Sequence, residues 1–348
     1  MPIFFNKTRL IFSLIFFLSV IINLIILFVS FLLKNLFSFN DLLSWIRKDF
    51  YSLPRLSPDG KFLTWVTWNH PHMPWHGTEL WVGEVSSDGC LANTVLVAGG
   101  SDESVLHPQW SPENELHFVS DRTGWWNLYR VRSGRTEALH KMDAEFAGGG
   151  WALGESKYDF SDNNNVICGF NQNGSWQFAE IDSESLNFEV YDLPFTDIGR
   201  SGIHVRSGNQ CVFTVGSPSS AIAVVNFDLT SRATEVLRWS KEINIDIDHM
   251  SIPEAIQFPT ENGLISHAFF YPPLNQQFEG PTSEKPPLLV ISHGGPTGAT
   301  SATLKLETQY WTNRGIAVVD VNYGGSTGYG VAYRQRLTGK WGIVDVED

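Results

Sequence analysis

Residues 287–295 read PLLVISHGG, and residues 315–330 read GIAVVDVNYGGSTGYG. Each stretch begins as a continuous apolar run and ends in glycines, a pattern typical of a buried parallel strand followed by a tight turn. Residues 303–313, between them, have helical spacing, and residues 331–337 form a second short helical segment. A strand, a helix, a strand and a helix in this order predict a doubly wound α/β unit.

The helix expected between the two strands places Leu306, Tyr310 and Trp311 on one side, and Gly315 follows it as a stop signal. Just upstream, residues 257–272 read QFPTENGLISHAFFYP, which predicts a hairpin that turns around the Glu-Asn-Gly sequence. This mixture of helices and strands differs from the strand-rich sequence that precedes it.

From residue 51 to about residue 250, short apolar or alternating runs are separated by Gly, Pro, Asn, Asp and Ser, which predicts many short strands. The turn sequence PRLSPDG at residues 54–60 is echoed by PQWSPEN at residues 108–114. The units so marked are near the length of a propeller blade, so we expect a partial β-propeller of about four blades. They cover residues 52–100, 101–146, 147–193 and 194–245. The strand candidates are residues 61–68, 79–85, 115–120, 126–132, 166–170, 176–181, 211–216 and 221–229.

The sequence GGSTG around Ser326 matches G-x-S-x-G, the nucleophile elbow of serine hydrolases. In that fold the triad follows the chain order nucleophile, acid, histidine. Downstream of Ser326, however, the only carboxylates are Asp345, Glu347 and Asp348, and the last histidine of the chain is His293. Ser326 is therefore interpreted as a turn residue, and we expect no catalytic nucleophile, acid or base in these 348 residues.

The tetrapeptide His293-Gly294-Gly295-Pro296 directly follows a predicted strand. Glycines at that position let the backbone turn with an N–H aimed into a site, as in the oxyanion-hole loop of α/β-hydrolases. The alternative is an ordinary Gly-Pro turn.

The combination of HGGP, NYGGSTGYG and WGIVDVED resembles the start of the catalytic domain of the prolyl oligopeptidase family, closest to its acylaminoacyl-peptidase and dipeptidyl-aminopeptidase branch. Upstream, SPDGKFLTWVTWNHPHMPWHGTELWV and SDRTGWWNLYRV resemble the propeller of that branch. The resemblance implies an incomplete α/β-hydrolase domain over residues 251–348, after a partial propeller over residues 51–250. It also implies a full-length serine peptidase that cleaves peptides near their N-terminus by acyl-enzyme chemistry.

Carried over residue by residue, the resemblance implies that the backbone N–H of Gly295 is an oxyanion donor in a loop shaped by His293, Gly294 and Pro296. It further implies a structural and access loop, made of Tyr323, Gly324, Gly325, Ser326, Thr327, Gly328 and Tyr329. The family's nucleophile lies beyond this loop, in a later G-x-S-x-G segment, so this chain alone is expected to be inactive.

An apolar segment runs from Leu10 to Leu33 within residues 1–50, with only four polar positions. As a helix it would span roughly 36 Å, against about 30 Å of membrane hydrocarbon, so it is a candidate single-pass anchor. The resembled branch does not normally carry such a segment. Two hypotheses therefore stay open: a fragment of a soluble cytoplasmic or organellar peptidase, and a membrane-anchored, non-catalytic propeller that binds partners.

The composition limits the partners further. The formal net charge is −13 and no basic run interrupts it, which argues against nucleic acid as a partner. Three widely spaced cysteines predict buried thiols rather than a disulfide framework. We expect no cofactor and no metal, and peptides as the substrates of the full-length protein. Neither the oligomeric state nor the substrate specificity follows from the sequence.

Overall fold

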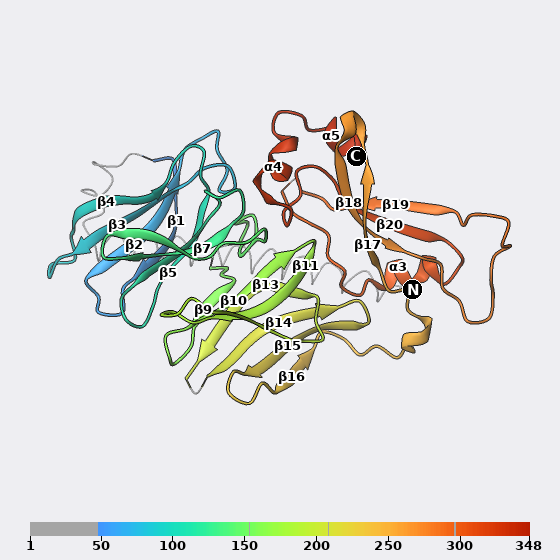
Figure 1. Ribbon diagram of the computed structural model, residues 1–348, viewed down its shortest axis with the longest axis horizontal. Coiled ribbons are helices and arrows are strands. Elements are labelled where there is room, and N and C mark those ends of the chain that lie inside the picture. Colours follow the sequence, from blue (N-terminus) through green and yellow to red (C-terminus); the bar gives the residue numbers. More distant parts are fainter. Residues whose placement is uncertain (1–47, 153, 208, 296) are drawn as a thin grey trace, which may run out of the picture.

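The computed structural model describes residues 48–152, 154–207, 209–295 and 297–348. Five four-stranded sheets follow one another along the chain (Figure 1). Within each of the first four sheets, every pair of neighbouring strands is antiparallel and the spatial order equals the chain order. Each of the four expected units thus corresponds to one sheet.

The bounds of the first sixteen strands follow, sheet by sheet. The first sheet contains β1 (Phe50–Leu56), β2 (Phe62–Trp68), β3 (Glu79–Val85) and β4 (Leu91–Gly99), and the second contains β5 (Val105–Trp110), β6 (Leu116–Ser120), β7 (Asn127–Arg132) and β8 (Arg135–His140). The third contains β9 (Tyr158–Phe160), β10 (Val166–Gln172), β11 (Ser175–Ile181) and β12 (Phe188–Tyr191), and the fourth contains β13 (Asp197–Arg206), β14 (Gln210–Ser217), β15 (Ser220–Asp228) and β16 (Thr234–Trp239). All eight strand candidates from the sequence are confirmed.

The repeated turns have a common geometry. In the first sheet, the Gly60 N–H donates to the Ser57 carbonyl (2.9 Å), and in the second sheet the Asn114 N–H donates to the Ser111 carbonyl (2.9 Å). Gly60 (φ +74°) and Asn114 (φ +64°) both adopt the left-handed conformation that this turn requires. The Asp59 N–H also donates to Asn114 Oδ1 (3.0 Å), so the turn motif joins adjacent sheets as well as adjacent strands.

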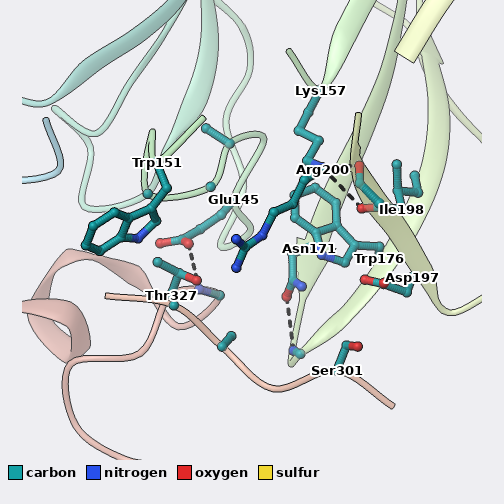
Figure 2. A pocket seen from close by; sticks show the side chains of 18 of the residues that line it. Glu145, Trp151, Lys157, Asn171, Trp176, Asp197, Ile198, Arg200, Ser301 and Thr327 are labelled. Carbon is teal, nitrogen blue, oxygen red and sulfur yellow. Dashed lines mark hydrogen bonds between the residues drawn. The ribbon is translucent and has the colours of Figure 1, made fainter. Parts of the chain in front are cut away.

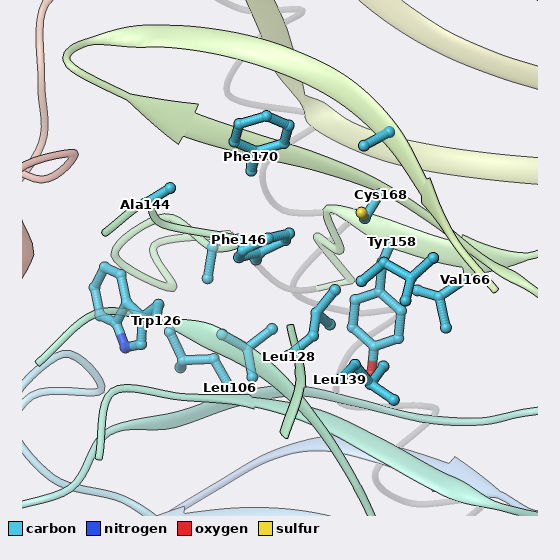
Figure 3. Close-up of a cluster of buried hydrophobic side chains, with 14 of the residues drawn as sticks. Leu106, Trp126, Leu128, Leu139, Ala144, Phe146, Tyr158, Val166, Cys168 and Phe170 are labelled. Atoms are coloured by element: carbon cyan, nitrogen blue, oxygen red, sulfur yellow. The ribbon is translucent and has the colours of Figure 1, made fainter. Parts of the chain in front are cut away.

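Apolar side chains fill the space between successive sheets. Figure 3 shows the largest cluster, in which Leu128 of the second sheet and Phe170 of the third pack with Phe146 from the connection between them. A second cluster joins the third and fourth sheets around Phe178 and Phe213, whose rings stack at a centroid distance of 4.7 Å. Burial of such faces is the main force that holds one sheet against the next.

The fifth sheet is mixed, with the spatial order β17-β18-β20-β19. It contains β17 (Glu254–Pro259), β18 (Ile265–Tyr271), β19 (Leu288–Ser292) and β20 (Ala317–Asn322). β17 and β18 form the expected hairpin, and β19 runs parallel to β20. The helix α3 (Leu306–Thr312) connects the two parallel strands, and α4 (Gly330–Arg334) and α5 (Val344–Glu347) follow β20.

Two details of this region correct the sequence interpretation. β20 is buried along its whole length as expected, but β19 is an edge strand, with Leu288 55% and Val290 61% exposed. In α3, Leu306 and Tyr310 are exposed while Gln309 is buried, because the Gln309 side chain hydrogen-bonds the backbone of Ser251 through both its oxygen (2.7 Å) and its nitrogen (2.9 Å).

None of the helices in the described part of the chain is long and apolar enough to cross a membrane. The candidate span from Leu10 to Leu33 lies outside the described residues. Cys168 and Cys211 are buried as expected, whereas Cys90 is partly exposed.

The packing between the third and fourth sheets makes a stability prediction. Phe178 is 1% exposed and contacts the rings of Phe213 and Phe227, so Phe178→Ala should lower the free energy of unfolding by about 3–5 kcal/mol. Val190, 45% exposed in the same sheet, is the matched control, and Val190→Ala should change that value by less than about 0.5 kcal/mol. Urea titrations measure both. Equal effects of the two substitutions would contradict the assignment of this core.

Candidate functional site

The loop after β19 is held against the turn after β20. The imidazole of His293 stacks on Tyr323 with a centroid distance of 4.5 Å and an interplanar angle of 16°. The Tyr323 hydroxyl donates to the His293 carbonyl (3.2 Å), and His293 Nε2 lies 2.7 Å from Ser326 Oγ. Burial lowers the pKa of His293. Gly294 and Gly295 follow directly, and Pro296 lies outside the described residues.

The contact between His293 and Ser326 resembles a catalytic Ser-His dyad, but it differs from one in the burial of the serine and in the partners of the histidine. Ser326 is fully buried, and its hydroxyl donates to the Tyr323 carbonyl (2.8 Å). No carboxylate hydrogen-bonds His293 among the residues that the structure describes. Since a nucleophile must reach its substrate and needs an oriented base, the geometry makes Ser326 a structural link between two loops.

Sequence analysis missed this link because the two residues are 33 positions apart. The signal that could have revealed it is the pairing of the two strands. β19 and β20 are parallel neighbours with Ser292 opposite Val321, so the loops that leave their carboxyl ends must lie side by side.

The turn after β20 is also held from the other side, by a carboxylate of the strand-rich region. Glu145 is 0% exposed, and its carboxylate accepts hydrogen bonds from the backbone N–H groups of Gly328 (2.6 Å) and Gly330 (3.2 Å). Arg334 of α4 contacts Glu145 (3.3 Å) and Asp121 (2.6 Å). Burial raises the pKa of Glu145 and raises that of Asp121 to about 6, so the carboxylates need these partners to remain ionised.

The glycines of this turn are required by the close approach. Gly328 (φ +95°) and Gly330 (φ +83°) both lie in the left-handed region. A Cβ on Gly330 would lie 3.1 Å from the carbonyl oxygen of Gly124, which also accepts a hydrogen bond from the Val331 N–H (2.9 Å). The turn after β20 is therefore a docked turn that requires glycine at these two positions.

A cavity of about 240 Å³ lies where the loops meet the sheets (Figure 2). The loop that starts at His293 contributes residues 297–301 to its wall, and the docked turn contributes Thr327 and Gly328. The opposite wall is made by side chains of the strand-rich region, among them Glu145, Trp151, Lys157, Asn171, Trp176, Asp197 and Arg200. The Trp151 indole N–H donates to the Thr297 carbonyl and so joins the two walls.

None of the cavity side chains from the strand-rich region was singled out from the sequence. They come from three places along the chain, and no spacing pattern connects them. Arg122, in the turn after β6, is not part of this wall and forms an ion pair with Glu103 (2.7 Å). The folded chain thus brings the loop after β19 and the turn after β20 next to side chains that are distant in the sequence.

The chain is similar to known peptidases. The family model for the prolyl oligopeptidase family matches residues 302–348. The peptidase YuxL of Bacillus subtilis is 37% identical over 99 residues, which are 28% of this chain and 14% of that protein. A probable dipeptidyl-peptidase 5 of Aspergillus niger is 24% identical over 314 residues, which are 82% of this chain and 40% of that protein.

Among solved structures, a puromycin-hydrolyzing peptidase of Mycobacterium tuberculosis superposes with a TM-score of 0.82 at 39% identity, over 86% of this chain and 46% of that one. The four-stranded antiparallel sheets match the propeller part of such peptidases. The fold and the family model together indicate the class of serine-type peptidases. The chain is thus similar to the prolyl oligopeptidase family, through the family model over residues 302–348 and through solved peptidase structures over most of its length. It spans less than half the length of each of these relatives.

The role of Glu145 can be tested by substitution. Glu145→Gln removes a buried charge and leaves Arg334 and the turn N–H groups short of one acceptor, so it should lower the free energy of unfolding by about 3 kcal/mol. Hydrogen exchange of the Gly328 and Gly330 amides should accelerate. The matched control is Glu189→Gln, which removes an exposed partner of Arg232 and should cost less than about 1 kcal/mol. Unchanged exchange at both glycines would show that Glu145 does not hold the turn.

Proposed function

We propose that this chain forms a partial propeller and the first part of the α/β-hydrolase domain of a serine peptidase that cleaves peptides near their N-terminus. In this proposal the cavity receives the peptide, and the backbone N–H of Gly295 stabilises the oxyanion of the tetrahedral intermediate. The dipeptidyl-peptidase and puromycin-hydrolyzing relatives support the substrate class.

One observation carries the proposal. The loop with the candidate donor and the docked turn form one wall of the cavity, and side chains of the strand-rich region, here called the propeller wall, form the opposite wall. A parallel strand that ends in such a loop is where α/β enzymes place their sites, since the carboxyl ends of neighbouring strands open there. The contacts of His293 with Tyr323 and Ser326 hold the loop in place without a substrate. Preorganised donors of this kind are a large part of catalysis in acyl transfer.

The proposal assigns no acyl transfer to these residues alone. Ser326 is inaccessible, and a donor N–H without an accessible nucleophile and base cannot form an acyl-enzyme. The nucleophile, acid and base of the full-length peptidase are proposed to lie in sequence that follows these residues, which peptide mapping of the native protein by mass spectrometry can test. Peptides that continue into a further G-x-S-x-G segment support the proposal, and a mature C-terminus at Asp348 contradicts it.

The 348-residue chain should therefore fail to react with a fluorophosphonate that labels active serines. An active serine hydrolase added to the same sample serves as the positive control for the reagent. Gel fluorescence or mass spectrometry after labelling gives the readout, and Ser326→Ala identifies the site of any adduct. Labelling of the wild-type chain that disappears in this variant would establish Ser326 as a nucleophile and refute the structural role given to it here.

A further inference from the structure

One side chain in the cavity is presented by an irregularity of the fourth sheet. β13 pairs Ile198 with Val215 and then Ile203 with Phe213, so four residues, 199–202, stand opposite the single residue Thr214. Bulges of this kind interrupt pairing and redirect a side chain, and they are common beside active sites. Here the redirected side chain is that of Arg200, which extends into the cavity (Figure 2).

Glycines at both ends make this bulge possible. A Cβ on Gly199 would lie 2.0 Å from Thr214 Oγ1, and one on Gly202 would lie 2.6 Å from the Ser156 carbonyl oxygen. Gly202 also has a φ of +84°, which strains any other residue. The bulge is thus built into the sequence at these two positions.

A buried lysine holds the bulge in place. Lys157 Nζ donates to the carbonyls of Ile198 (3.1 Å) and Gly199 (2.7 Å), and lies 3.4 Å from Glu155. Its side chain is 2% exposed, and its ammonium lies 4.8 Å from the ring centroid of Trp176. These contacts use all three N–H donors of the ammonium group. Lys157 therefore stabilises the bulge and has no donor left for a ligand.

Arg200 is the cation left for a ligand. Its guanidinium has no hydrogen-bond or ion-pair partner among the residues that the structure describes. Two of the carboxylates that line the cavity are engaged elsewhere, since Glu145 binds the docked turn and Arg334, and Glu155 pairs with Lys157. Burial raises the pKa of the third, Asp197, and the charges of Lys157 and Arg200 oppose that rise, but Asp197 and Arg200 form no ion pair among the described residues. A guanidinium on a fixed backbone, open to a cavity, matches a carboxylate in shape and charge.

We propose that Arg200 binds a carboxylate of the peptide that occupies this cavity. The inference rests on the proposed function for the peptide itself and adds the chemical group that the propeller wall recognises. Trp151, 48% exposed, and Trp176 line the same cavity and offer apolar surfaces to the rest of the peptide. The carboxylate comes either from the C-terminus of a short peptide or from an acidic side chain.

Calorimetric titration of the 348-residue chain separates these sources. The probes are the tripeptide Ala-Ala-Phe with a free carboxylate, its C-terminal amide, and the amide of Ala-Glu-Phe. At least one carboxylate probe should bind roughly ten-fold or more tightly than the Ala-Ala-Phe amide, and added salt should reduce the difference. Arg200→Met should reduce the affinity for that probe to the level of the amide. Arg238→Met, at an exposed arginine of β16 in the same sheet, should leave the difference intact.

The outcomes distinguish this inference from the proposed function. Tighter binding of the free tripeptide assigns the C-terminal carboxylate, and tighter binding of the Glu-containing amide assigns an acidic side chain. Equal binding of all three probes, or a preference that survives in Arg200→Met, overturns the role of Arg200 while peptide binding stands. If no probe binds, the peptide cavity of the proposed function fails, and the inference fails with it.

Discussion

The rest of the site depends on the carboxylate of Glu145. Its own backbone is fixed by the third sheet, since its N–H donates to the Asn171 carbonyl (2.9 Å) and its carbonyl accepts from the Asn171 N–H (2.8 Å). Its side chain binds two backbone N–H groups of the turn after β20, and that turn holds His293 through Ser326. A buried carboxylate is costly by several kcal/mol, and charge-assisted hydrogen bonds with Arg334 offset the cost.

These linked contacts explain how the four antiparallel sheets and the mixed fifth sheet come to share one cavity. The four antiparallel sheets are held together by apolar clusters that fix their spacing but are not directional. Orientation relative to the fifth sheet comes instead from polar contacts with defined geometry: Glu145 with the turn, Arg334 with Asp121, and the Trp151 indole with Thr297. Apolar packing builds the wall, and hydrogen bonds position the loops against it.

Which features the sequence could predict depends on whether they arise from local patterns or from contacts between distant residues. Strand periodicity and turn residues are local, so the sheets, the hairpin before β19 and the buried strand β20 could be predicted. The exposure of Val290 depends on its strand being at an edge, and the burial of Gln309 depends on hydrogen bonds to Ser251, 58 residues away. The same holds for the cavity, whose Glu145 and Arg200 carry no local pattern that marks them as partners of a distant loop.

Several costly features of the structure border the cavity. The bulge at residues 199–202, the buried ions Lys157 and Glu145, and the left-handed Gly328 each have a cost in stability. Each of these features contributes lining residues to the same space of about 240 Å³. A fold that required only stable sheets would not need a buried lysine to hold a distorted strand. The role in binding proposed for the cavity would give the fold a physical reason to keep these costly features.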